Sequence, residues 1–280
     1  MAEKKSIIEW IEAMPREVIY TIMLIVLIIP LIRPLGIPVP VSARIKEWHE
    51  FIQNLPEGSY VLVSIDYGAG TIPTFEPFML ATMHDLFSRP LKIVIMTTYA
   101  DGPICYKSVM DKLKPEETYG KKYGEDYVFL GYIPGGETAM KAIGENLPKA
   151  VPMDFYRTPI DQIPMLKGIT GAKDFAVVVT VTPSGDVSEG WIRQWVTPYG
   201  TPYLCCVLAM MEPTMMPYYQ AGQCKALCTD AHAGEYEFLI GKPGEGIKKL
   251  DAFSLSLTVL AILIIIANIL YFVLKAGGKK

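Results

Sequence analysis

The sequence has few of the residues on which familiar catalytic sites are built. It contains 3 histidines and 5 cysteines among 280 residues. It also lacks a Gly-x-Ser-x-Gly motif, which would place a serine nucleophile at a strand-to-helix turn. A net charge of -3 provides no basic surface for nucleic acid. These absences argue against an acyl-transfer enzyme and against a nucleic-acid-binding protein.

Apolar residues are abundant and gather at the two ends of the chain. They make up 51% of the sequence. Residues 252–274 carry no charge, match the roughly 20 residues needed to cross a bilayer, and precede a basic tail at 275–280. Residues 18–35 hold a shorter apolar run that includes Pro30, and we interpret them as a first transmembrane helix. Arg33 and Pro34 stand where a signal peptide would have small residues, so the sequence favours an uncleaved anchor.

Residues 1–17 read as a segment that lies on the membrane surface. Ser6 and Glu9 form a capping-box pattern, and apolar residues follow at helical spacing. An alternative is that this segment simply extends the first transmembrane helix. In either case the predicted partner is the lipid bilayer.

Two spans would put both termini on one side of the membrane and the central domain on the other. Counting lysine and arginine near the spans does not decide the orientation, because each side has six. The tail side has Lys4, Lys5, Arg16, Lys275, Lys279 and Lys280, and the domain side has Arg33, Arg44, Lys46, Lys242, Lys248 and Lys249. Cys205 and Cys206 lie together in an apolar run, where they resemble buried thiols. We therefore predict an integral membrane protein with a cytosolic domain.

The middle of the chain alternates between apolar runs and helical patterns. Residues 36–59 are predicted to be a linker and a juxtamembrane helix, residues 60–241 an α/β domain, and residues 242–251 a second linker. Five short runs rich in β-branched residues predict buried strands: 60–65, 91–96, 127–130, 175–181 and 203–209. Helices are predicted at 75–87, 102–113, 136–147, 187–196, and from about 213 through 228. This order favours a doubly wound, mainly parallel five-stranded sheet of the Rossmann or flavodoxin-like type.

Two further segments suggest contacts rather than chemistry. Residues 154–173 belong to a long connection, and its segment VPMDFYRTPIDQIPMLKG at 151–168 is proline-rich. This segment is predicted to cover one edge of the sheet or to contact a neighbour. Residues 210–220, MMEPTMMPYYQ, could bind Cu(I) through thioethers, but methionine more commonly fills irregular gaps. We interpret them as a protein contact surface or a layer that caps the sheet.

Ligands of doubly wound sheets bind at the carboxyl ends of the strands, where two glycine-rich turns fall in this sequence. A candidate ligand site therefore comprises Asp66, Tyr67, Gly68, Gly70, Glu76, Gly135, Gly136 and Glu137. No lysine follows either turn as in a phosphate-binding loop, and acidic residues open the nearby helices. The site is expected to disfavour an anion, and no cofactor is predicted.

Two groups of residues in the sequence could bind a metal ion. Asp66, Glu76, Asp101 and Glu137 map to one rim and could hold Mg²⁺, although acidic residues at helix starts are more often caps. Cys224, Cys228 and His232 recur every four residues, so on a continuous helix they would share one face. Buried thiols and a loop histidine are the commoner explanation for this second pattern.

Four stretches resemble an uncharacterised family of microbial membrane-anchored proteins. They are VLVSIDYGAGT together with Glu76, YGEDYVFLGYIPGGE at 123–137, PYYQAGQ at 217–223, and AGEYE at 233–237. The resemblance implies an α/β protein with two terminal transmembrane helices, and it does not imply any enzymatic activity. Cys224 and Cys228 depart from the apolar residues expected there, which further weakens the metal interpretation.

The sequence favours a non-catalytic role. The leading hypothesis is a membrane-anchored α/β scaffold or assembly subunit that forms oligomers with itself or with other membrane proteins. The alternative is a ligand-binding or metal-binding enzyme domain with its site at the carboxyl edge of the sheet. No catalytic residue is assigned.

Overall fold

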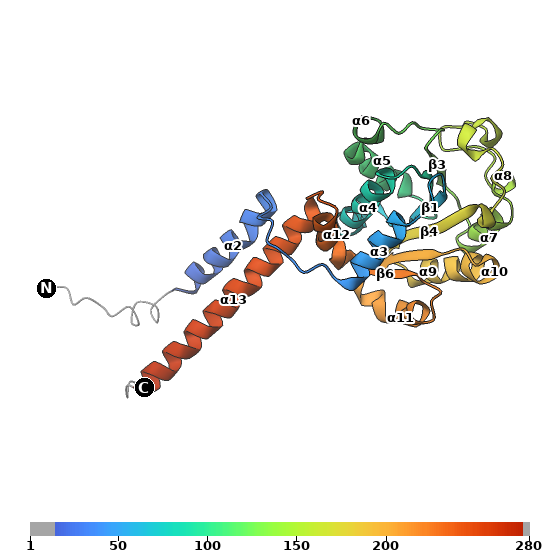
Figure 1. The fold of residues 1–280 in the computed structure, drawn as a ribbon. Coiled ribbons are helices and arrows are strands. Elements are labelled where there is room, and N and C mark those ends of the chain that lie inside the picture. The colour runs from blue at the N-terminus through green and yellow to red at the C-terminus, as the bar shows by residue number, and fades with distance from the viewer. Residues whose placement is uncertain (1–14, 277–280) are drawn as a thin grey trace. The chain divides into compact units, whose positions relative to one another are not determined.

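A computed structural model describes residues 15–276, which form two units. One unit comprises residues 39–242 and contains the sheet. The other combines the chain up to residue 38 with the chain from residue 243 onward, and its described helices are α2 (Arg16–Ile32) and α13 (Glu245–Ala276) (Figure 1). The predicted surface segment at 1–14 and the tail at 277–280 lie outside the described residues.

The described part of the α/β unit is built on six parallel strands in the order β3-β2-β1-β4-β5-β6. Nearly every residue in these strands is buried, as expected for a sheet with both faces covered. The predicted α/β fold is therefore confirmed. The strands are β1 (Tyr60–Ile65), β2 (Lys92–Thr97), β3 (Tyr127–Tyr132), β4 (Phe175–Thr182), β5 (Tyr203–Val207) and β6 (Ala226–Thr229).

The prediction of five strands was wrong, because the last predicted helix ends early. Helix α11 (Glu212–Gln220) stops before Gly222, whose φ of +72° is incompatible with a continuing helix. The chain then forms β6, in which Cys228 lies opposite Cys206 of β5. The four residues of β6, ALCT, are too short a run to distinguish a strand from the end of a helix.

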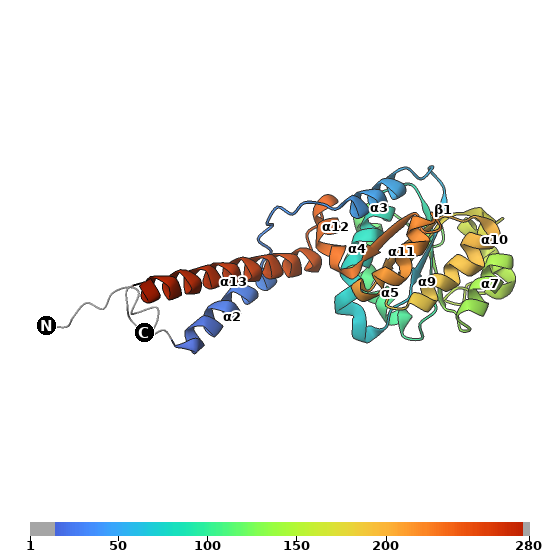
Figure 2. The same cartoon turned by 90° about the horizontal axis from the view of Figure 1, so that it is seen from below.

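Helices cover both faces of the sheet (Figure 2). One face carries α3 (Ala43–Gln53), α4 (Ile72–Phe87), α5 (Gly102–Leu113) and α12 (Ala233–Leu239). The other carries α7 (Glu137–Glu145), α8 (Leu147–Ala150), α9 (Gly185–Trp191), α10 (Thr197–Tyr199) and α11. A short helix, α6 (Pro115–Tyr119), follows α5.

Each face has its own hydrophobic core of large side chains. Trp48, Phe78 and Tyr236 are buried on the first face, and Trp191 and Trp195 on the second. Met215 of α11 also enters the second core, and other residues of its segment pack around it. The interpretation of residues 210–220 as a layer that caps the sheet is therefore confirmed.

The edge strand β3 is covered by the long connection between α8 and β4. The backbone N–H of Phe155 donates to the carbonyl of Phe129 at 3.0 Å, and the Phe155 ring packs over Gly131. Gly131 has a φ of +88°, and a Cβ there would lie 3.2 Å from that ring. The prediction that this proline-rich segment covers a sheet edge is confirmed.

The helical unit contains one helix that is long and apolar enough to cross a bilayer. Among the described residues this is the stretch Glu245–Val273 within α13. Helix α2 has 17 residues, includes Pro30, and would reach only about 25 Å at 1.5 Å per residue. The structure thus supports one span, and the second remains a prediction.

A single carboxylate ties the end of α2 to the start of α13. Asp251 is 1% exposed and accepts three consecutive backbone N–H groups. Its Oδ2 lies 2.7 Å from Leu35 N and 2.9 Å from Gly36 N, and its Oδ1 lies 3.1 Å from Ile37 N. Gly36 has a φ of +66°, so the chain can curl its N–H groups around one anion.

We predict that Asp251→Asn loosens this turn. An amide cannot match a carboxylate that accepts three N–H groups, and a buried donor without a partner costs about 1 to 3 kcal/mol. Hydrogen exchange of the Leu35, Gly36 and Ile37 amides in micelles should accelerate by about tenfold to a hundredfold. Glu245→Gln, on the same helix, is the control and should leave these amides protected. Unchanged exchange in Asp251→Asn would contradict this role.

Candidate functional site

The carboxyl ends of β1 and β4 form the point where the strand order reverses. β2 and β3 lie on one side of β1, while β4, β5 and β6 follow on the other. Side chains that follow these strands are therefore the first place to look for a ligand site. Asp66 directly follows β1 and its N–H donates to the carbonyl of Val181 in β4 at 3.0 Å.

Asp66 is fully buried and faces the protein. Its Oδ2 accepts from Ser64 Oγ at 2.6 Å, and its Oδ1 accepts from the backbone N and the hydroxyl of Thr98 at 2.7 and 2.8 Å. The indole of Trp191 lies beside it without reaching hydrogen-bond geometry. Burial raises the pKa of Asp66, against the opposing effect of the hydrogen bonds from Ser64 and Thr98. This carboxyl group joins the ends of β1 and β2.

The loop that follows is closed by the protein's own carboxylate. Asp101 Oδ2 accepts the N–H of Ala69 at 2.7 Å, and a Cβ on Gly68 would lie 3.0 Å from the same oxygen. Gly68 therefore permits the close approach of Asp101, whereas Gly70 has open space around it. Tyr67 is buried and stacks on Phe75 with ring centroids 5.7 Å apart, and burial raises its pKa well above the ordinary value.

Glu76 lies on the face of the sheet that α4 and α5 cover. It is 4% exposed, and it binds Lys112 and Ser108, both from α5. These contacts of Glu76 with Lys112 and Ser108 join α4 to α5. Glu76 therefore has protein partners for both carboxylate oxygens.

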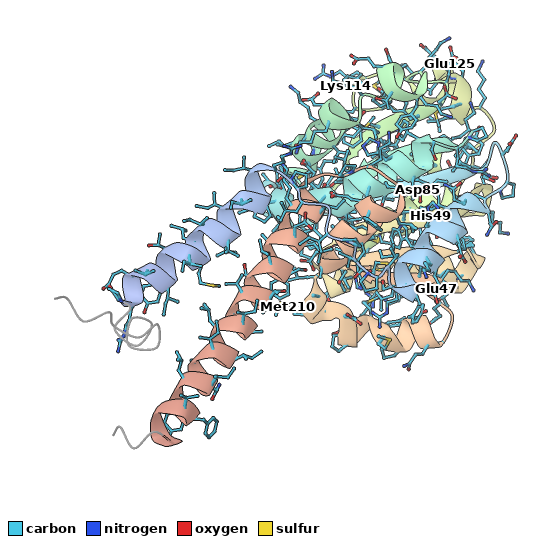
Figure 3. The ribbon with its side chains drawn as sticks, turned by 60° about the vertical axis from the view of Figure 1, so that its left-hand side comes forward. Glu47, His49, Asp85, Lys114, Glu125 and Met210 are labelled. Atoms are coloured by element: carbon cyan, nitrogen blue, oxygen red, sulfur yellow. The ribbon has the colours of Figure 1, made fainter. Side chains whose placement is uncertain are left out.

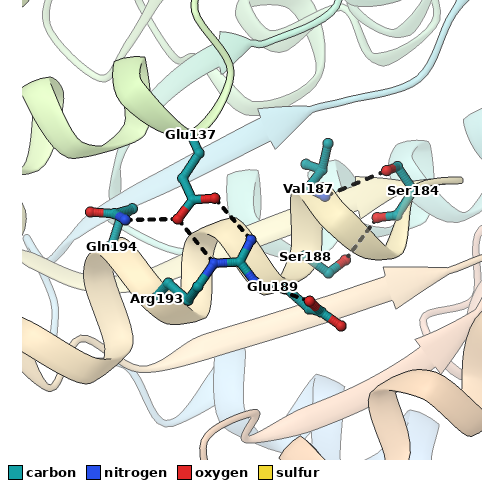
Figure 4. Close-up of polar contacts among 7 residues, drawn as sticks. All are labelled: Glu137, Ser184, Val187, Ser188, Glu189, Arg193 and Gln194. Carbon is teal, nitrogen blue, oxygen red and sulfur yellow. Dashed lines mark hydrogen bonds and ion pairs between the residues drawn. The ribbon is translucent and has the colours of Figure 1, made fainter.

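Glu137 lies on the opposite face, at the first residue of α7 (Figure 4). Gly135 and Gly136, with φ of +113° and +54°, turn the chain into that helix. Arg193 donates Nε and Nη2 to Glu137 at 3.0 and 2.8 Å, and Gln194 donates at 2.7 Å. These hydrogen bonds, led by Arg193, lower the pKa of Glu137 to about 2. Arg193 and Gln194 belong to a π-helical turn, Ile192–Val196.

The structure therefore separates the acidic residues that the sequence placed on one rim. Asp66 and Asp101 close the loops after β1 and β2, while Glu76 and Glu137 occupy opposite faces. Within residues 15–276, no three His, Cys, Asp or Glu side chains are arranged to hold a metal ion.

Cys224, Cys228 and His232 do not share a helix face, so that premise of the metal interpretation was wrong. Cys224 precedes β6, Cys228 lies within it, and His232 lies in a 3₁₀ turn. The Cys224 thiol donates to the carbonyl of Ala226 at 3.0 Å. His232 Nδ1 lies 3.0 Å from the backbone N of Thr229 and 2.8 Å from its hydroxyl. Both thiols are buried, and burial raises their pKa.

Comparison with protein-family models, with curated proteins and with solved structures found no match for this chain. The resemblance to a membrane-anchored family stays a prediction.

A cavity of about 900 Å³ lies beside strand β3 and was not predicted from the sequence. Its lining includes five aromatic side chains and five charged residues from α5, α6 and the residue between them. We call the five aromatic residues the aromatic edge: Tyr106, Tyr123, Tyr127, Phe155 and Tyr156. Phe155 and Tyr156 are 46% and 59% exposed, whereas Tyr106 and Tyr127 are buried.

The rings of the aromatic edge support one another. Tyr106 stacks on Phe129 with centroids 3.8 Å apart, and Phe129 contacts Phe155 at 5.1 Å. Tyr123 meets Tyr156 edge to face at 5.2 Å. The hydroxyl of Tyr123 donates to Asp154 at 2.7 Å, which fixes its ring. The two exposed rings are therefore held by a packed base.

Three tyrosines of the aromatic edge, Tyr106, Tyr123 and Tyr127, stay uncharged around neutral pH. Burial raises the pKa of Tyr127 to about 12 and raises the pKa of Tyr106 and Tyr123 further. Around the rings lie both acidic and basic side chains, among them Lys107, Asp111 and a Lys114–Glu117 pair at 3.2 Å. Exposed aromatic residues inside a polar rim are typical of a protein-binding surface.

We predict that Asp66 makes stability fall as the pH rises. Because burial raises its folded pKa above the ordinary 3.8, the folded state favours the protonated acid. The melting temperature of the wild type minus that of Asp66→Asn should therefore decrease between about pH 4 and about pH 8.

Asp126→Asn is a matched control for this titration. Burial alone would raise the pKa of Asp126, but hydrogen bonds from Lys122 and Lys92 outweigh it and lower the pKa. The melting temperature of the wild type minus that of Asp126→Asn should therefore not decrease over the same pH range. If the melting temperature of the wild type minus that of Asp66→Asn instead increases with pH, the prediction is contradicted. The hydrogen bonds to Asp66 would then affect its pKa more than burial does.

Proposed function

We propose that the protein is a membrane-anchored assembly subunit whose α/β domain binds another polypeptide through the aromatic edge. The observation that carries this proposal is the pair of exposed rings, Phe155 and Tyr156, at a cavity of about 900 Å³. Helix α13 supplies the anchor. The partner is a second copy of the chain or another membrane protein.

The physical basis is the cost of leaving large rings in water. Exposed aromatic side chains that are already ordered lose little conformational entropy on binding, and Tyr is enriched among the residues that dominate interfaces. Tyr156 rests against Phe155, with centroids 5.3 Å apart, and against Tyr123. A partner that covers these rings gains apolar contact without first ordering them.

The membrane topology we infer has two spans. Support comes from α2, which packs antiparallel to α13 within the helical unit and is joined to it by Asp251 (Figure 1). An antiparallel pair returns both termini to the same side of a bilayer. The apolar residues of α2 are largely exposed, as expected for a helix facing lipid.

We further propose that the α/β domain faces the cytosol. All five cysteines are free and buried, which suits a reducing compartment. Because native thiols are buried, labelling requires an added cysteine at an exposed position such as Glu57. Labelling of Glu57→Cys from outside intact cells would contradict the cytosolic assignment.

An enzyme or metal site at the carboxyl edge receives less support. Asp66, Glu76, Asp101 and Glu137 each accept hydrogen bonds from protein groups. A ligand there would have to displace these contacts.

We predict that Tyr156→Ala weakens the assembly. Removing an exposed anchor ring should raise the dissociation constant by about tenfold or more. Light scattering of the detergent-extracted protein over a dilution series measures self-association, and the amount of co-purified partner measures hetero-association. Phe238→Ala is the matched control, because Phe238 is a 42% exposed aromatic on α12 outside the aromatic edge.

Phe238→Ala should assemble as the wild type does. A wild-type protein that is monomeric at every concentration and that retains no partner from native membranes would contradict the proposal.

A further inference from the structure

A second cavity, of about 340 Å³, lies among α3, α4, α6 and the chain after α12. Its lining is polar and includes two of the three histidines of the protein. The lining residues are His49, Gln53, His84, Asp85, Ser88, Tyr119, Leu239, Ile240 and Lys242. None of them belongs to the aromatic edge or to the carboxyl edge of the sheet.

Asp85 is the one acidic residue of this lining, and its carboxylate already accepts three hydrogen bonds. It is 3% exposed and accepts from His49 Nδ1 at 2.8 Å, Gln53 Nε2 at 2.6 Å and Tyr236 Oη at 2.6 Å. Figure 3 shows His49 and Asp85 side by side. Since Nδ1 of His49 donates to Asp85, its Nε2 lies on the opposite side of the ring.

The other charged group of the lining is a cation without a counterion. Lys242 is exposed, and its ammonium group has no acceptor within residues 15–276. His84 hydrogen-bonds to the hydroxyl of Tyr119 at 2.6 Å through Nδ1. Burial, and secondly the charge of Lys242, lower the pKa of His84 to about 4. His84 is therefore neutral near pH 7 and available as a hydrogen-bond partner.

We propose that this cavity binds a small anion of the phosphate or carboxylate class between Lys242 and the Nε2 side of His49. Lys242 supplies the charge, and the Nε2 side of the His49 ring, which is turned away from Asp85, forms part of the polar lining. His84 and the Ser88 hydroxyl complete a polar wall. An anion would replace the missing counterion of Lys242.

Because the protein has three histidines, anion binding can be tested by following the NMR signal of each histidine ring. In the full-length protein labelled with ¹³C-histidine and held in detergent, each ring gives its own NMR signal. Titration with inorganic phosphate, and separately with acetate, should shift the signals of His49 and His84 in a saturable way. His232 is an internal control, because its Nδ1 is hydrogen-bonded to Thr229 in another part of the domain. Bound phosphate should also raise the pKa of His84, since it offsets the charge of Lys242.

Two variants isolate the role of the lysine. Lys242→Met should raise the half-saturating phosphate concentration by about tenfold or more, which corresponds to about 1.4 kcal/mol. Lys225→Met removes another exposed lysine and should leave the titration unchanged. Saturation by a short-chain phosphatidic acid at lower concentration than by phosphate would identify a lipid headgroup as the source, and equal concentrations would identify a soluble anion.

The proposal is overturned if neither anion shifts His49 and His84, if all three histidines shift together, or if Lys242→Met titrates as the wild type does. These outcomes are independent of assembly through the aromatic edge, because Tyr156→Ala should leave the anion titration intact.

Discussion

The arrangement of the α/β unit depends on the need to cover an all-parallel sheet on both faces and at its exposed edge. Helices on both sides bury the faces, but the backbone of β3 lies at the outer edge of the strand order. An uncovered edge offers unpaired N–H and C=O groups to any other strand. The connection after α8 meets this need through the hydrogen bond from Phe155 to Phe129. The same connection brings Phe155 and Tyr156 to the surface, so the edge that is closed to strand pairing carries exposed aromatic side chains.

The carboxylates show how polar groups stabilise the same frame. Asp66 joins β1 to β2, Glu76 joins α4 to α5, and Glu137 joins α7 to the π-helical turn that contains Arg193. In the helical unit, Asp251 gathers three backbone N–H groups. Each acid is near a helix end or strand end, and each connects two segments of the chain.

Much of the fold follows from local sequence patterns, and most of the candidate site does not. Runs such as YVLVSI predict buried strands because β-branched residues suit a covered sheet. The strand at 226–229 was missed because four residues carry too little periodicity. The four acidic residues were wrongly grouped on one rim. Glu76 and Glu137 both follow strands that end at the same edge of the sheet, but the helices that carry them, α4 and α7, pack on opposite faces. The aromatic edge draws on residues spread from 106 to 156, and Asp251 meets a turn 216 residues away, so neither has a local signal.

The central claim is that the aromatic edge is the surface through which a membrane-anchored protein assembles. The most direct measurement places a photo-crosslinking amino acid at position 156 in the full-length protein and irradiates native membranes. The account predicts one discrete adduct, whose mass identifies a second copy or a single partner, and little adduct from the same probe at position 238. A probe at position 156 that yields only the uncrosslinked chain, or the same products as position 238, would contradict it.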